Sequence, residues 1–403
     1  MIYRRRIEAV TDSAAQERNN HKISSHNMPN GFMLVCTNKS EKQMLDSLVF
    51  PQSVVYGHKV FSIKPEDYVF LYNLDTDVLY GTFIAETEGQ YDPNLPLFNG
   101  KYPYYVKVKA IDGIKQLKHA KSFFNKLGIS RKDYLTHKGV SAIISGINGE
   151  FNIKKSKDYI DRDYKPHIMS TTLWDYHKQS YGYTPKGSNK YPGVTPAFVI
   201  YNLVWRYTKP GDLVLDPMAG SGTTIDVCKE ERRRVMAFDI VPTREDIIQA
   251  DARKLPIEDS IVNLVFIDSP YGDNIRYNEH PDNIGHISAT DEKFYDELER
   301  VMIECHRVMK TGAVLGWLIG DQWAKKVFVP VGFKIYERLT KHFEPIDVIC
   351  VVRRNQTSNT PFWQSKALQH NFYLRGFKYL FVVRKSCEKK HSNLKVKWNF
   401  YER

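Results

Sequence analysis

A short run near the middle of the chain, FIDSPYGDN at residues 266–274, gathers side chains that could do chemistry. The apolar stretch before it is typical of a buried strand, and it ends at Asp268, Ser269, Pro270 and Tyr271. Asp268 is a hydrogen-bond acceptor, Pro270 fixes the direction of neighbouring carbonyls, and Tyr271 offers a face for stacking. Serine, proline and glycine also favour turns, so this run alone indicates only a turn after a strand.

A second run, LVLDPMAGSGTT at residues 213–224, places a turn with two glycines between an apolar strand and a helix predicted at 225–231. Gly220 and Gly222 would let a ligand approach the backbone closely, and the first N–H groups of a helix are unpaired. Such a turn suits phosphate, but it holds no basic residue, and Asp216 puts a negative charge at the strand end. The turn therefore favours a cationic or zwitterionic ligand over pyrophosphate.

Two further carboxylates continue this pattern. Asp239 closes the next apolar strand, where it could hold ribose hydroxyls, and Asp251 follows a third short strand. Each acid taken singly is typical of a helix cap or a solvated side chain. Together with Asp216 they close successive strands of one sheet, which indicates a shared binding site.

An alternation of strands and helices that begins after Leu173 must position these residues. Apolar strands are predicted at 213–216, 234–240, 261–268 and 313–320, and helices at 196–207, 225–231 and 291–310. This alternation predicts the α/β class, with a mostly parallel sheet flanked by helices. Ligands of such open sheets bind beyond the carboxyl ends of the strands, where two of the predicted strands end in aspartate.

Composition narrows the class of protein. The chain has 403 residues, which suffices for two domains, and a net charge of +12 with a pI near 9.2. The charge favours a polyanionic partner, although many basic proteins are merely soluble. No apolar run reaches the roughly 18 residues of a membrane span, and the basic N-terminus lacks the apolar segment of a secretory signal. The five cysteines are scattered, which predicts reduced thiols in a cytoplasmic protein, without disulfides or a metal site.

The amino-acid sequence predicts four segments: a loose polar leader at 1–30, a β-rich domain at 31–145, a linker at 146–164 and a second domain at 165–403. The β-rich domain is predicted from runs of Val, Phe, Tyr and Ile that Asn, Asp and Gly interrupt. A helix within 115–135 is expected to close it. No internal repeat or low-complexity tract is present.

The pair DPMAGSGTT at 216–224 and DSPY at 268–271 resembles the S-adenosylmethionine-dependent amino-methyltransferases of the cytosine-N4 and adenine-N6 DNA methylase family. The family's cofactor loop has the form DPFxGSGTT, with Met218 here in place of Phe, and its catalytic tetrapeptide is a variant of D/N/S-P-P-Y/F/W. The closing segment 371–385 resembles the family's last strand pair. The resemblance covers residues 165–385. It implies a Rossmann-like class I methyltransferase fold, S-adenosyl-L-methionine as cofactor and nucleic acid as substrate.

The resemblance also assigns residues to the cofactor. Those implied are Asp216, Gly220 and Gly222 around the amino-acid end, Asp239 at the ribose, Asp251 at the adenine amino group, Thr172 and Trp174 in the methionine pocket, and Pro217 and Thr223 as further cofactor-binding residues. The last two rest on the similarity of segment 171–174, with the helix that opens at Pro196, to the family segment that completes this pocket. A plain core position fits Trp174 equally well.

The tetrapeptide implies methylation of an exocyclic amino nitrogen, whose lone pair is delocalised into the base. Asp268 and the backbone carbonyl of Ser269 or Pro270 would hold the amino hydrogens and aim the lone pair at the methyl group. Tyr271 would stack on a base swung out of the helix. Ser269 replaces the usual first proline, so DSPY does not decide the base. We favour cytosine N4 over adenine N6 because the serine hydroxyl could supply the contact instead of Asp268.

Two further features concern the substrate. The N-terminal runs VFLYN and LYGTFIA, followed by Gly89, resemble the development-and-cell-death type of domain, a relative of PUA-like barrels that often bind RNA. Recruitment of nucleic acid and a packing or protein-interaction role fit this domain equally. Arg353 and Arg354 open a loop rich in amides and are predicted to contact backbone phosphate, with a solvated charged loop as the alternative.

These features predict a site-specific DNA methyltransferase. The alternatives are a cytosine-N4 methyltransferase of RNA, such as ribosomal RNA, a methyltransferase for a protein glutamine, and a nucleic-acid-binding protein without catalysis. The basic charge and the long C-terminal section disfavour the glutamine enzyme. The intact glycine turn and tetrapeptide disfavour the non-catalytic protein. The recognition sequence, the oligomeric state and any partner nuclease stay open.

Overall fold

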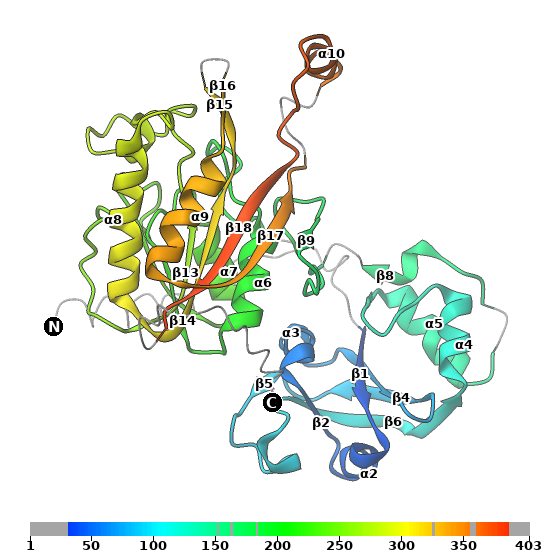
Figure 1. The fold of residues 1–403 in the computed structure, drawn as a ribbon. Helices are drawn as coiled ribbons and strands as arrows, with labels where there is room; N and C mark the ends of the chain where they lie inside the picture. The colour runs from blue at the N-terminus through cyan, green and yellow to red at the C-terminus, as the bar shows by residue number, and fades with distance from the viewer. Residues whose placement is uncertain are drawn as a thin grey trace, which may run out of the picture. The chain divides into compact units, whose positions relative to one another are not determined.

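The computed structural model describes residues 31–150, 153–161, 164–182, 184–324, 327–354 and 360–386. The chain divides into two compact units between Lys165 and Pro166 (Figure 1). The predicted leader at 1–30, the amides at 355–359 and Cys387 lie outside the described residues. Among the described residues, no helix is long and apolar enough to cross a membrane.

The N-terminal unit is built on one sheet, which confirms the prediction of a β-rich domain. Its strands are β1 (Gly31–Cys36), β2 (Val49–Gln52), β3 (Tyr68–Asn73), β4 (Val78–Ala85), β5 (Gln90–Tyr91), β6 (Tyr104–Lys118), β7 (Tyr134–Leu135) and β8 (Ile160–Asp161). Their order is β2-β6-β4-β3-β1-β7-β8, with β5 beside β6. Only β1 and β3 are parallel neighbours among these described strands. Two residues of the segment predicted as a linker, Ile160 and Asp161, pair with β7.

Helices cover this sheet and close its core. They are α2 (Asn38–Ser47), α3 (Val54–Ser62), α4 (Ala120–Leu127) and α5 (His137–Ile147). The helix predicted within 115–135 is shorter than that range, because β6 continues through Lys118. Phe123 of α4 and Ile143 of α5 pack with Phe70 of β3 in one buried cluster.

The second unit contains an eight-stranded sheet that is mostly parallel, as predicted. Its strands are β9 (Leu173–Trp174), β10 (Leu213–Asp216), β11 (Arg234–Asp239), β12 (Ile248–Gln249), β13 (Val262–Asp268), β14 (Met309–Ile319), β17 (Glu344–Val352) and β18 (Phe377–Arg384). The order is β12-β11-β10-β13-β14-β18-β17-β9, in which β18 runs antiparallel to both neighbours. The strand pair predicted in 371–385 is wrong: this segment supplies β18 alone, and its partners β14 and β17 come from earlier in the chain.

Helices cover both faces of this sheet (Figure 1). They are α6 (Ala197–Tyr207), α7 (Thr223–Glu230), α8 (Glu292–Val308) and α9 (Val331–His342). Helix α10 (Pro361–Gln369) lies apart from these layers, in the connection between β17 and β18, and a separate hairpin is formed by β15 (Gln322–Ala324) and β16 (Val327–Val329). Helix α8 is capped by Asp291, whose carboxylate accepts a hydrogen bond from the Lys293 N–H. Its apolar residues recur every three or four positions, so Leu298 and Met302 enter the core with Leu315 of β14.

The opposite face of β14 receives α6. Gly316 has no side chain, and a Cβ atom there would lie 2.5 Å from the Leu203 Cδ1 of α6. This close packing holds α6 against β13 and β14. The sheet is therefore buried on both faces, which matches its continuous apolar strands.

The order of the strands locates the binding edge. From β10 the chain proceeds outward to β11 and β12, and then returns to place β13 on the other side of β10. Open sheets bind ligands outside the carboxyl ends of the strands at such a reversal. Asp216 ends β10 and Asp268 ends β13, so both motifs predicted from the sequence lie at this point of the fold.

Candidate active site

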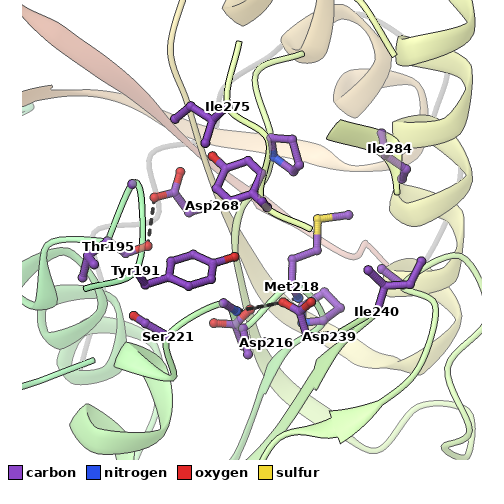
Figure 2. A pocket seen from close by; sticks show the side chains of 18 of the residues that line it. Tyr191, Thr195, Asp216, Met218, Ser221, Asp239, Ile240, Asp268, Ile275 and Ile284 are labelled. Atoms are coloured by element: carbon purple, nitrogen blue, oxygen red, sulfur yellow. Dashed lines mark hydrogen bonds between the residues drawn. The ribbon is translucent and has the colours of Figure 1, made fainter. Parts of the chain in front are cut away.

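A pocket opens at the carboxyl ends of β10, β11 and β13 (Figure 2). Residues that the sequence singled out and that line it are Asp216, Pro217, Gly220, Thr223, Asp239, Asp251, Asp268, Pro270, Tyr271 and Arg353. The end of the glycine turn at Thr224 and the start of the DSPY tetrapeptide at Asp268 are 44 residues apart in the chain, yet both motifs line one cavity. A ligand in this pocket would touch both motifs at once.

Asp216 is the most deeply placed acid of the pocket, with 4% of its surface exposed. Its Oδ1 accepts from the Met218 N–H at 3.1 Å, and its Oδ2 accepts from the Thr224 hydroxyl. Burial raises the pKa of this carboxyl to about 7, although both hydrogen bonds favour the charged form. No cation among the described residues forms an ion pair with it. The site therefore offers a carboxylate that a cationic ligand would stabilise.

The glycine turn needs its glycines for two reasons. Gly220 and Gly222 both have positive φ, +51° and +80°, a region that side chains disfavour. A Cβ atom on Gly220 would lie 3.0 Å from the Tyr191 ring, and one on Gly222 would lie 2.6 Å from the Arg244 guanidinium. Gly222 caps α7 and does not line the pocket, whereas Gly220 and Thr223 do. The first glycine thus faces the ligand space, and the second supports the turn.

Asp239 and Asp251 lie along the same edge. The Asp239 carboxylate accepts from the Gly220 N–H at 2.9 Å and from the Val241 N–H at 3.1 Å, and burial raises its pKa. Burial also acts on Asp251, but hydrogen bonds from Arg253 outweigh it and leave the pKa of this carboxyl below its usual value. Both oxygens of Asp251 accept from that guanidinium, at 2.6 to 3.0 Å, and its charge is neutralised in this ion pair. The oxygens of Asp239 accept from neutral backbone N–H groups, so Asp239 is the more available acceptor of the two.

Asp268 is held by three side chains. Its Oδ2 accepts from the Thr195 hydroxyl at 2.8 Å (Figure 2). Its Oδ1 accepts from the Tyr271 hydroxyl at 3.0 Å. The Lys378 ammonium lies 3.2 Å from Oδ2 in an ion pair that is about nine-tenths buried, and 5.1 Å from the centroid of the Tyr271 ring. The carboxylate is thus fixed in direction by residues from three separate segments of the chain.

Ser269 points away from the pocket. It is 1% exposed, and its hydroxyl accepts a hydrogen bond from the indole N–H of Trp317 on β14 at 3.1 Å. The pocket is lined by Asp268, Pro270 and Tyr271, but not by Ser269. The structure therefore removes the reason for favouring cytosine, because this hydroxyl does not face the place where a base would bind.

An aromatic wall completes the pocket. The rings of Tyr191 and Tyr277 are stacked with their centroids 5.9 Å apart, and Figure 2 shows Tyr191 between Asp216 and Asp268. Burial raises the pKa of both phenols well above the usual value, so both stay neutral. Neither tyrosine was predicted, nor were Thr195 and Lys378. The signal that could have found the first part of this wall is the run KYPGVTP at 190–196, where proline and glycine precede α6.

Three predicted residues lie elsewhere. Trp174 lies in the edge strand β9, and Thr172 is two residues before it in the chain. Neither residue lines the pocket, and four other strands separate β9 from β10. Trp174 is 1% exposed and donates its indole N–H to the Thr171 carbonyl, which is the plain core position considered as its alternative. Arg354 is exposed and pairs with Asp175, with its Nε 2.8 Å from Oδ1. Arg353 lines the pocket.

The chain belongs to the DNA methylase family, whose model matches residues 103–250 and 262–402. The model of the development and cell death domain matches residues 30–131. The resemblances to both families, the Rossmann-like methyltransferase fold and the prediction of a methyltransferase are thereby confirmed at the level of the family.

Individual relatives match over shorter stretches. The type II methyltransferase M2.DpnII of Streptococcus pneumoniae is 39% identical over 54 residues, which are 13% of this chain and 20% of the relative. M.Cfr9I of Citrobacter freundii, another type II methyltransferase, is 42% identical over 52 residues, 13% of this chain and 17% of the relative. The chain thus spans a fifth or less of the length of these relatives.

Two solved structures are also similar over part of the chain. A protein assigned as a DNA modification methylase from Thermus thermophilus, in complex with S-adenosyl-L-methionine, is 24% identical, with 36% of this chain and 57% of that one covered and a TM-score of 0.25. TrmN from Thermus thermophilus is 16% identical, with 48% and 50% covered and a TM-score of 0.33. The family assignment rests on the family model and not on these structures.

Proposed function

We propose that this protein is an S-adenosyl-L-methionine-dependent DNA methyltransferase that acts on an exocyclic amino nitrogen. The observation that carries the proposal is the meeting of the two motifs: Asp216 and Gly220 of the glycine turn line the same cavity as Asp268, Pro270 and Tyr271. Membership of the DNA methylase family supports DNA as the substrate. The cytoplasmic location remains a prediction from the sequence.

The residues of the glycine turn suit the cofactor. S-adenosyl-L-methionine carries an ammonium and a sulfonium, and the buried Asp216 carboxyl, whose pKa is about 7, is stabilised in its charged form by a nearby cation. Asp239 offers an acceptor for ribose hydroxyls, and Asp251 lies farther along the same edge. Gly220 keeps the backbone open to the ligand. When bound, the cofactor supplies an electrophilic methyl group.

The chain's own residues position the nucleophile. An amino group that donates one hydrogen to Asp268 and the other to a backbone carbonyl of the tetrapeptide has its nitrogen lone pair turned away from both acceptors. Thr195 and Lys378 keep the carboxylate pointing in that direction. Tyr271 presents a ring beside it for the base, with the Lys378 ammonium over that ring. Catalysis here is mainly orientation in a pocket walled by Tyr191 and Tyr277.

The base is proposed as either adenine or cytosine. Both carry an amino group beside a ring nitrogen, so an acceptor at Asp268 suits either. We favoured cytosine from the sequence because the Ser269 hydroxyl could contact the base, but in the structure this hydroxyl accepts a hydrogen bond from Trp317 in the core. Other residues of the pocket must therefore distinguish adenine from cytosine.

The proposal is tested by methyl transfer from labelled S-adenosyl-L-methionine to DNA and RNA in parallel, followed by nucleoside analysis. We expect label in DNA as N6-methyladenine or N4-methylcytosine. The Asp268→Ala variant, which removes the proposed acceptor, should retain cofactor binding, which calorimetry measures, and lose transfer. Label in RNA alone would contradict the proposed substrate, and full transfer by Asp268→Ala would contradict the proposed site.

A further inference from the structure

The connection between β17 and β18 exposes several aromatic side chains. It contains α10, which Figure 1 shows at the outer end of these two strands. Phe362 and Trp363 in the first turn of α10 are 62% and 45% exposed, and Tyr373, which follows the helix, is 81% exposed. Only Ala367 of α10 is buried. The helix therefore presents its rings to solvent and does not pack them into the unit's core.

The connection carries positive charge and no acid. Residues 353–376 contain four arginines and lysines and no aspartate or glutamate, and of the four, Arg354 pairs with Asp175 of another segment. One of them, Lys366, lies on α10 with its ammonium 5.9 Å from the centroid of the Phe362 ring. Exposed rings among cations without any acid suit a polyanion that carries stacked bases.

Both ends of this connection enter the pocket. Arg353, which follows β17, and Lys378, in β18, line the pocket, and Lys378 pairs with Asp268. The Arg353 N–H donates to the Gly376 carbonyl at 2.9 Å and extends the ladder between the two strands. The connection therefore begins and ends at the edge of the pocket. A nucleic acid whose base binds at Asp268 would lie next to it.

The β15–β16 hairpin supports the second half of the connection. The Trp323 ring of β15 meets the Phe372 ring edge-on with centroids 6.1 Å apart, and the Arg375 guanidinium lies 5.2 Å from the Phe328 ring of β16. These contacts hold the residues that lead from α10 into β18. Tyr373 lies between these two anchored residues in the chain.

We propose that residues 360–378, the α10 arm, bind double-stranded DNA beside the target base. Phe362, Trp363 and Tyr373 stack on bases next to the one that has swung out, and Lys366 contacts phosphate. A base that leaves the helix deprives its neighbours of a stacking partner, and an aromatic ring can take its place. The inference rests on the proposed function and adds to it the surface that receives the duplex.

The test uses the full chain with the double substitution Phe362→Ala, Trp363→Ala. The matched control is Phe333→Ala, because Phe333 on α9 is 65% exposed and lies outside the α10 arm. Affinity is measured by fluorescence anisotropy with a labelled duplex cut from DNA that the wild-type protein methylates. We expect the double variant to bind at least about tenfold more weakly and the control to bind like wild type. Lys366→Ala should lower the slope of log affinity against log salt by about one.

The outcomes separate this inference from the proposed function. Calorimetry with S-adenosyl-L-methionine shows whether each variant keeps a folded cofactor site, and Tyr373→Ala provides an independent second test of the arm. Wild-type affinity in both aromatic variants, with methyl transfer intact, overturns the α10 arm alone. A wild-type protein that neither binds nor methylates DNA overturns both proposals. A change from dimer to monomer at unchanged DNA affinity would make the arm a self-association surface and overturn the inference.

Discussion

Replacement of Asp216 by asparagine should stabilise the protein without its cofactor. Burial raises the pKa of this carboxyl from 3.8 to about 7, so the folded chain keeps a proton that the unfolded chain has lost. Between about pH 4 and pH 7 the folded state therefore binds more protons, and its stability falls as the pH rises. Above about pH 7 the carboxyl is ionised in both states, and the loss of stability caused by the buried charge stays constant.

The size of this penalty follows from the two pKa values. A difference from 3.8 to about 7 corresponds to about 4 kcal/mol of free energy of unfolding, fully expressed above pH 7. Asparagine cannot ionise, so this loss of stability is absent in the variant. Its single side-chain oxygen can accept from either the Thr224 hydroxyl or the Met218 N–H, and the loss of one of these two hydrogen bonds costs about 1 kcal/mol. We therefore expect Asp216→Asn to be about 3 kcal/mol more stable than wild type at about pH 8. At about pH 4 and below, only the lost hydrogen bond remains, and the variant should be about 1 kcal/mol less stable than wild type.

Urea unfolding of both proteins at several values between about pH 5 and pH 8 measures this difference, in which the contributions of groups that do not interact with Asp216 cancel. Asp347→Asn, at an exposed position of β17, controls for the removal of one negative charge. Parallel stability curves for wild type and Asp216→Asn would refute the reasoning. In wild type, the affinity for S-adenosyl-L-methionine should rise with pH up to about tenfold per unit below pH 7, and in the variant it should be low at every pH.

Three further substitutions test the geometry around the site. Lys378→Met leaves the Asp268 carboxylate without its buried cation and should lower the free energy of unfolding, measured by urea titration, by about 3 kcal/mol. Lys378→Arg keeps a cation beside Asp268 and should restore most of this stability. Ser269→Ala leaves the Trp317 N–H unpaired and should cost about 1 to 3 kcal/mol in stability with little change in the rate of methyl transfer; a collapse of that rate would show that the hydroxyl serves the substrate. Gly222→Ala places a Cβ at positive φ against Arg244 and should lower stability by more than about 1 kcal/mol, so an unchanged melting temperature would contradict the role given to this glycine.

The part of the site that could be predicted from the sequence is the part built by strand ends. Apolar strands that end in Asp216 and Asp268, with helical periodicity between them, require a parallel sheet, and a parallel sheet brings its carboxyl ends to one edge. The glycine turn could be predicted for the same reason, because it follows directly from β10. The roles of these residues toward the cofactor and the base stay predictions.

The remainder depends on tertiary contacts that no local pattern encodes. Tyr191 and Thr195 come from an irregular segment, and Lys378 comes from a strand 110 residues after Asp268. Ser269 stands after the strand end, where the alternation of faces no longer applies, so its turn toward Trp317 was not predictable. Trp174 was assigned to the pocket from a family likeness, and the register of β9 against β17 places it at the far edge of the sheet.

The hydrogen bond from Thr195 to Asp268 joins the two motifs through one short segment of the chain. Thr195 lies four residues after Tyr191, whose ring lies beside Gly220 and, in Figure 2, between Asp216 and Asp268. If the cofactor binds against this ring as proposed, we expect it to restrict the Thr195 hydroxyl that orients the Asp268 carboxylate. By linkage, cofactor and DNA would then raise each other's affinity by the same factor, whichever of the two binds first.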